Sequence, residues 1–129
     1  VPSGGGVGTA RAIGKAYGVF AAGGDELGLK RETIEALKAP AIPSRHGFSD
    51  ECLRGPARFS LGFMKPSEAL PFGHAGAFGA PGAGGSMGYA DPEVGIGYGY
   101  VTNRMGTDLQ GDPRDVALRA AIPPSAPVP

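Results

Sequence analysis

The spacing of apolar and polar residues predicts two short helices before a region of strands. Apolar residues recur at helical spacing from Ile13 to Ala21, after Thr9, which is a suitable N-cap. The pair Gly23-Gly24 is suited to end this helix because glycine readily adopts the left-handed conformation of a C-cap. A second amphipathic helix is expected over 31–38, stopped by Pro40. These helices need a partner on which to bury their apolar faces.

The second half of the chain has the period-two alternation and turn residues of an antiparallel sheet. Four strands are expected, over 58–64, 72–78, 85–90 and 95–103. Residues 80–83 are expected to form a connection, and Asp91-Pro92-Glu93-Val94 suits a type I turn. The Gly- and Pro-containing segment 40–57 is expected to be irregular, as functional loops often are.

Three glycines on one face of the fourth expected strand predict the close approach of a helix. Gly95, Gly97 and Gly99 alternate with larger residues, so that one strand face carries almost no side chains. The final helix is a candidate to cover it, since Asp112 and Pro113 mark its start. Its expected contact residues are small: Val116, Ala117, Ala120 and Ala121. The pattern predicts an α+β domain over 1–122, with an antiparallel sheet packed by helices, and a disordered tail at 123–129.

Composition excludes several classes of function. Twelve basic residues balance twelve acidic ones, so there is no basic surface for nucleic acid. No apolar run is long enough to span a membrane, and the first residues do not resemble a secretory signal, which favours the cytoplasm. Cys52 is the only cysteine and is expected to be a packed structural thiol, and neither a metal nor a cofactor is expected. His46, in the irregular segment, is expected to be an exposed or locally bonded histidine.

Several ordered motifs resemble the C-terminal part of the β-lactamase-related serine hydrolases. The motifs are Phe72-Gly73-His74-Ala75-Gly76, Gly84 to Glu93 (GGSMGYADPE) and Gly99 to Met105 (GYVTNRM). The upstream segments Gly8-Thr9-Ala10-Arg11 and Arg58 to Phe63 are similar to what precedes them in esterase-like members. This family includes class C β-lactamases, DD-peptidases and esterases of the same fold.

The resemblance implies site residues at 74–77. The family carries a Lys-Thr-Gly or His-Thr-Gly element on an edge strand of the site, and His74-Ala75-Gly76 matches it with alanine in place of threonine. By this match His74 and Ala77 are catalytic, with Ala77 donating its backbone N–H to the oxyanion, and Ala75 and Gly76 contact the substrate. Phe78 to Ala83 make the interval to Gly84 longer than the compact family pattern.

The family's nucleophile motif is absent from the printed sequence. No serine is followed by lysine three residues later, and Tyr100-Val101-Thr102-Asn103 does not have the family's tyrosine spacing. The expected function is therefore that of a C-terminal segment of a serine hydrolase acting on an ester or amide, inactive alone. Its partner would be a companion part that carries the nucleophile, or a second copy of the chain. The alternatives are a non-catalytic binding module that keeps the sheet, and an independent small domain.

Overall fold

The fold is described from a computed structural model for residues 4 and 6–122, and the predicted tail lies outside these residues. Three helices are present, α1 (Ala10–Ala21), α2 (Arg31–Lys38) and α3 (Pro113–Ala120), with a 3-10 turn η2 (Asp25–Leu27) between the first two. The strands are β1 (Ser49–Asp50), β2 (Gly55–Pro56), β3 (Phe59–Ser60), β4 (Phe63–Met64), β5 (Phe78–Gly82), β6 (Ser86–Asp91) and β7 (Ile96–Tyr100). This confirms the α+β class, and both predicted N-caps accept backbone hydrogen bonds, Thr9 from Ala12 and Asp112 from Arg114.

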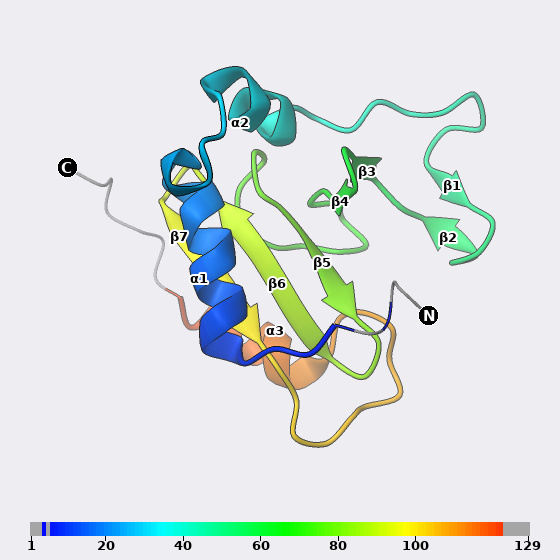
Figure 1. Ribbon diagram of the computed structural model, residues 1–129. Coiled ribbons are helices and arrows are strands. Elements are labelled where there is room, and N and C mark those ends of the chain that lie inside the picture. Colours follow the sequence, from blue (N-terminus) through cyan, green and yellow to red (C-terminus); the bar gives the residue numbers. More distant parts are fainter. Residues whose placement is uncertain (1–3, 5, 123–129) are drawn as a thin grey trace.

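An antiparallel sheet of five strands forms the centre of the molecule. Its order is β3-β4-β5-β6-β7, so each strand lies beside its neighbour in sequence (Figure 1). The β5–β6 pairing extends from Phe78 opposite Ala90 to Gly82 opposite Ser86. The predicted turn after β6 is present, with a hydrogen bond from the Val94 N–H to the Asp91 carbonyl. β1 and β2 form a separate small hairpin inside the segment predicted to be irregular.

The prediction of a single strand over 58–64 is wrong. The chain reverses at Leu61 and Gly62, which have φ values of 49° and 85°, and Phe59 pairs with Met64 in a tight hairpin. Successive positive φ values are typical of hairpin turns whose twist matches that of the flanking strands. The alternation of apolar residues here therefore reflects two short strands facing one another.

The second strand lies later in the sequence than predicted. β5 begins at Phe78 and continues through Gly82, so that 72–77 is not a strand and 80–82 is not part of a connection. Gly73 adopts a φ of 51°, and the Ala77 N–H donates to the His74 carbonyl, which makes a turn of this segment. The local hydrogen bonds of the turn replace those of a sheet ladder.

A helix crosses the glycine face of β7, as predicted, but it is α1 and not the final helix. A Cβ placed on Gly99 would lie 2.5 Å from the Ala10 carbonyl oxygen and 2.6 Å from the Gly14 nitrogen. On the neighbouring strand, a Cβ on Gly88 would lie 2.9 Å from Cγ2 of Ile13. Backbone therefore packs on backbone, with glycine on both the helix and the strand.

Helix α3 packs on the opposite face of the sheet, where its contacts are polar (Figure 1). The Tyr98 hydroxyl donates to Oδ1 of the buried Asp115 at 2.8 Å. The predicted small-residue face is exposed at all four positions, so that prediction is wrong. Tyr98 is buried, whereas Phe59 remains 48% exposed.

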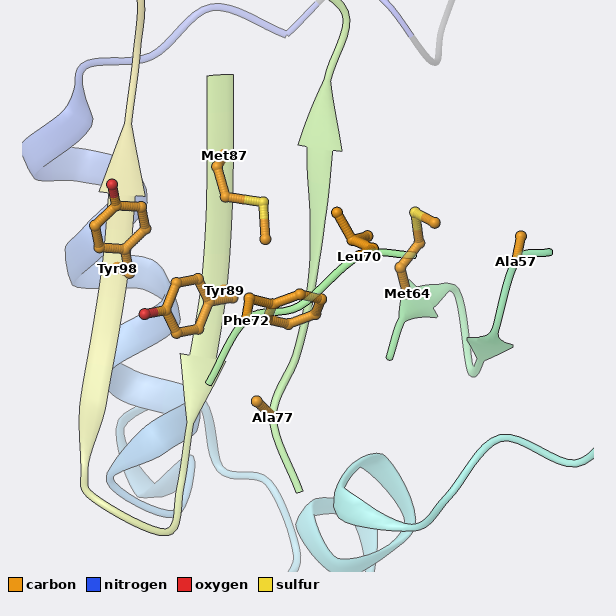
Figure 2. Close-up of a cluster of buried hydrophobic side chains, with 8 residues drawn as sticks. All are labelled: Ala57, Met64, Leu70, Phe72, Ala77, Met87, Tyr89 and Tyr98. Carbon is orange, nitrogen blue, oxygen red and sulfur yellow. The ribbon is translucent and has the colours of Figure 1, made fainter. Parts of the chain in front are cut away.

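Two apolar clusters occupy the two sides of the sheet. On the face away from α1, Phe72 packs on Tyr89, and Tyr89 stacks on Tyr98 with ring centroids 5.0 Å apart (Figure 2). On the α1 side, Phe78 is fully buried beneath Phe20 and Phe63. Ile34 and Leu37 join this second cluster from α2. The sheet is thus covered on both sides at the level of β5 and β6.

Candidate functional site

His74 lies in the turn that leads into β5, and a buried carboxylate fixes its position. Its backbone N–H and its ring Nδ1 both bond to Oδ2 of Asp91, at 2.9 and 2.8 Å. Asp91 is the last residue of β6 and only 2% exposed, whereas the His74 side chain is 43% exposed. A carboxylate only accepts hydrogen bonds, so Nδ1 carries the proton and Nε2 is the nitrogen left for solvent or a ligand.

The surroundings of His74 favour its protonated form. The hydrogen bond to Asp91 and the negative charge of that residue raise the pKa of His74 above its ordinary value, and Glu93 adds to the effect. Oδ1 of Asp91 also accepts the Glu93 N–H at 3.3 Å. The turn between β6 and β7 therefore helps to hold the carboxylate against the imidazole.

Gly73 makes this close approach possible. A Cβ at position 73 would lie 2.8 Å from Oδ2 of Asp91 and 2.6 Å from the Ala77 Cβ. The positive φ of Gly73 adds a second constraint, since L side chains rarely adopt it. Gly73 is thus required by the histidine–carboxylate pair.

The structure keeps Ala75, Gly76 and Ala77 beside His74 but places none of them on a strand. Ala77 is fully buried, and its N–H is engaged with the His74 carbonyl at 2.9 Å. An oxyanion role for this N–H therefore requires that hydrogen bond to open. The expected location of this motif on an edge strand is wrong, while its role in a site stays a prediction.

A buried lysine, Lys65, holds the turn that carries His74 against the C-terminal end of α2. Lys65, 3% exposed, donates from Nζ to the Leu37 carbonyl at 2.7 Å and also reaches the carbonyls of Lys38 and Gly76. Desolvation lowers the pKa of Lys65 to about 8. Lys65 thus connects the C-terminal end of α2 with the turn that carries His74.

The strand position expected of the motif is occupied by Ala80-Pro81-Gly82 instead. β4 pairs with β5 only at Met64 opposite Gly79, so beyond Gly79 β5 has no neighbouring strand on that side within the described part of the chain. A proline at 81 suits such an edge because it has no N–H to give to a ladder. Ala83, the residue that follows, is exposed, and its N–H has no acceptor among the described residues.

A hollow of about 460 Å³ lies against this end of β5. It is bordered by α1, by β5 and by the start of β6, through Tyr17, Ala80, Gly82 and Ser86 among others. The volume falls within the range of small-molecule sites. This hollow and the His74 turn lie at opposite ends of β5.

The other candidate residues have local roles or none. His46 is exposed and accepts a hydrogen bond from Nε of Arg45, which confirms the expectation. Cys52 is free, as predicted, but lies exposed in the turn between β1 and β2 and is not packed. Among residues 4 and 6–122, no group of three His, Cys, Asp or Glu side chains is placed to hold a metal ion. No helix in these residues is long and apolar enough to cross a membrane.

Sequence reasoning identified His74 but missed the two residues that hold its turn. Asp91 was interpreted only as the first residue of a turn, and nothing local links it to a histidine 17 positions earlier. Lys65 directly follows the strand predicted over 58–64, and no local pattern indicates that its side chain is buried. The only sequence feature that indicated a structural role for Asp91 was its position at the end of an apolar strand, where a buried carboxylate needs a hydrogen-bond donor.

Comparisons with known proteins agree with this architecture. Residues 2–121 match the family described as Beta-lactamase. The esterase/beta-lactamase LipL of Mycobacterium tuberculosis is 35% identical over 106 residues, which is 81% of this chain and 24% of LipL. The chain therefore spans about a quarter of that relative.

Solved structures show the same fold. A family VIII carboxylesterase matches with a TM-score of 0.76 and 35% identity, over 88% of this chain and 31% of the other. A penicillin-binding protein homologue from Caulobacter crescentus matches with a TM-score of 0.71 and 34% identity, over 85% and 30% of the two chains. With a family match that covers almost all of its length, the chain belongs to the β-lactamase-related serine hydrolases.

Proposed function

We propose that this chain supplies one wall of an acyl-transfer site in a hydrolase that cleaves an ester or amide through an acyl-serine intermediate. The observation that carries the proposal is the partly unpaired edge of β5, which has no neighbouring strand on that side beyond Gly79 among the described residues. An exposed strand edge can hold an extended acyl group by main-chain hydrogen bonds. Similarity to an esterase/beta-lactamase and to a carboxylesterase supports the same reaction class.

The nucleophile comes from a part of the hydrolase outside these 129 residues. The sequence has no Ser-x-x-Lys, and Ser86 lies on β6 with no titratable side chain bonded to it among the described residues. The chain contributes the sheet, the turn at 74–77 and the covering helices. Alone it is expected to be inactive.

Fluorophosphonate labelling tests this function. In the complete hydrolase, formed with the nucleophile-bearing part on the same or a companion chain, covalent labelling of one serine outside these 129 residues is expected. Intact-mass measurement and peptide mapping locate the adduct. If no serine is labelled in a preparation that hydrolyses no ester or amide, the chain is a non-catalytic binding module and the proposal falls.

Two backbone N–H groups are candidates for the oxyanion donor. The family resemblance assigns Ala77, whereas Ala83 follows a glycine on the free edge of β5, and its N–H has no acceptor among the described residues. Substitution by proline removes one N–H at a time. The variant that has lost the donor is expected to lose about 100- to 1,000-fold in kcat. Circular dichroism separates this loss from misfolding, which is a particular concern for Ala77→Pro.

The β3–β4 hairpin is proposed as a contact for the nucleophile-bearing part. Its turn presents Leu61, 64% exposed, next to Phe59, 48% exposed. Adjacent exposed apolar side chains favour association. The substitution Leu61→Asp is expected to weaken association between the two parts, as measured by sedimentation. Unchanged association would exclude the hairpin as a contact.

A further inference from the structure

The turn between β5 and β6 is bound to the loop that precedes α3. The Gly84 N–H donates to the Asp108 carbonyl at 3.2 Å, and the Gly84 carbonyl accepts the Gly106 N–H at 2.8 Å. Figure 1 shows this loop, residues 101–112, passing beside the end of β5. Gly84 is buried, whereas the preceding residue, Ala83, is exposed. The turn is therefore held through Gly84, and Ala83 stays accessible at the free edge of β5.

Asp112 and Arg114 hold the loop in its conformation. Arg114 donates from its backbone N–H and from Nε to Oδ1 of Asp112, both at 2.9 Å, and from Nη2 to Oδ2 at 2.6 Å. Nη1 of Arg114 donates to the Arg104 carbonyl at 2.9 Å. The Asp112 side chain is only 4% exposed. The pair thus joins the beginning of the loop to the beginning of α3.

Two glycines bring the carboxylate of Asp112 against both the turn and the loop. A Cβ at Gly85, in the β5–β6 turn, would collide with this carboxylate, and a Cβ at Gly106, in the loop, would lie 2.9 Å from its Oδ2. The carboxylate therefore lies between the two segments. A shift of Asp112 should move the β5–β6 turn as well as the loop.

We propose that Asp112 and Arg114 are positioning residues of the acyl-transfer site, which hold the β5–β6 turn so that the Ala83 N–H can donate to the oxyanion. This inference rests on the proposed function. The negative charge of the oxyanion develops only in the transition state, and a donor is most effective when it already points to that position. Ala83 lies between Gly82 and Gly84, and glycine backbone is the least restricted. The direction of the Ala83 N–H therefore depends on support from the neighbouring loop.

Helix α3 carries a second aspartate–arginine pair, which provides a matched control. Nε of Arg119 donates to Oδ2 of Asp115 at 2.8 Å, and Nη1 of Arg119 donates to the Pro71 carbonyl. Asp115 also accepts the Tyr98 hydroxyl. Among the described residues, none of these hydrogen bonds reaches the β5–β6 turn. Loss of this pair should therefore loosen α3 without moving Ala83.

The first experiment measures the kinetics of arginine variants in the complete hydrolase. Arg114→Gln is expected to lower kcat and kcat/KM by the same factor, about 10- to 100-fold, because a displaced donor weakens only interactions made in the transition state. Arg114→Lys keeps the charge but lacks the planar guanidinium, so it should recover little of the loss. Arg119→Gln should leave kcat unchanged. An equal fall in kcat for Arg114→Gln and Arg119→Gln would overturn the proposal.

The second experiment is independent of activity and follows backbone amides of the 129-residue chain by proton–nitrogen NMR. Arg114→Gln is expected to shift the amide resonance of Ala83 and to leave that of Ala77 in place. Arg119→Gln should not shift the resonance of Ala83. If Arg114→Gln does not fold, Arg114→Lys replaces it in both experiments. An Ala83 resonance that is the same in wild type and in the folded Arg114 variant would overturn the positioning role.

These outcomes separate this inference from the proposed function. Fluorophosphonate should label the same serine in the wild-type hydrolase and in Arg114→Gln, more slowly in the variant. Labelling of the wild type together with unchanged kcat in folded Arg114→Gln would overturn the positioning role and keep the function. Absence of labelling in the wild-type hydrolase would instead remove the function on which the inference rests.

Discussion

Gly97 of β7 lies directly beneath Gly18 of α1, so that a Cβ at position 97 would collide with the Gly18 backbone. A Cβ at position 18, by contrast, has no heavy atom within 4 Å. The two glycines of this contact therefore differ in whether a side chain can be accommodated. One must lack a side chain so that the helix can approach, and the other lies with its Cβ position towards open space.

The substitution Gly97→Ala is expected to lower the free energy of unfolding by about 1–3 kcal/mol or more, because the clash is with backbone and the helix must move. The matched control Gly18→Ala is expected to be neutral or to stabilise the chain by up to about 1 kcal/mol, since alanine favours a helix. Urea unfolding followed by circular dichroism measures both. Equal effects would contradict the packing of α1 on β7.

Substitution of Tyr98 tests the link between the sheet and α3. Tyr98→Phe removes the hydroxyl that donates to Asp115, while Nε of Arg119 still donates to the other carboxylate oxygen at 2.8 Å. The expected loss of unfolding free energy is about 0.5–1.5 kcal/mol, which is typical of one hydrogen bond. Tyr100→Phe is the control, since the Tyr100 hydroxyl bonds to no described residue. A larger loss in the control would contradict this assignment.

The stability of the chain should depend on Lys65 at alkaline pH. Its folded pKa of about 8 lies below the ordinary 10.5, so between these values the unfolded chain binds more protons than the folded chain. The unfolding free energy of wild type relative to Lys65→Met should therefore rise as pH increases from 8 to 10.5. Chemical unfolding across this range measures the difference. The control Lys15→Met changes an exposed position on α1 and keeps Lys65, so it should show the same rise relative to Lys65→Met as the wild type does.

Asp112 should make the chain sensitive to acid. Hydrogen bonds from Arg114 lower the pKa of Asp112 to about 2, from an ordinary 3.8. The stabilisation is therefore complete above pH 4 and is lost as pH falls towards 2. Asp112→Asn should flatten this part of the stability profile, as measured by thermal unfolding between pH 2 and 5. Asp108→Asn, at an exposed position, should keep the wild-type acid slope.

Much of the architecture could be predicted from the sequence, because the signals that determine it are local. Thr9 and Asp112 were identified as helix caps, and α2 has the predicted bounds. The third strand, which corresponds to β6, differs from its predicted range by one residue at each end. In these segments a hydrophobic pattern and a capping or turn residue indicated the same structure.

The predictions that failed depend on contacts between distant parts of the chain. Nothing local shows that the glycine face of β7 would receive the first helix and not the last, because both helices have small residues. The strand expected at 72–78 became a turn because Asp91, 17 residues after His74, binds two groups of that residue. The site residues that the resemblance assigns at 74–77 stay a prediction, but their expected position on a strand is wrong, because β5 begins only at Phe78.

The packing of α1 against β7 also bears on how the protein folds. This helix is made before all strands of the described sheet during synthesis, yet its docking surface is completed only when β7, the last of these strands, has been made. Ile13, Tyr17 and Phe20 contact β4, β5 and β6, but the helix backbone at Gly14 and Gly18 has no partner until β7 is made. Contacts between distant parts of a chain form slowly, and uncovered apolar surface promotes aggregation. The glycines that allow the helix to approach so closely therefore make the folding of the whole domain depend on one late event.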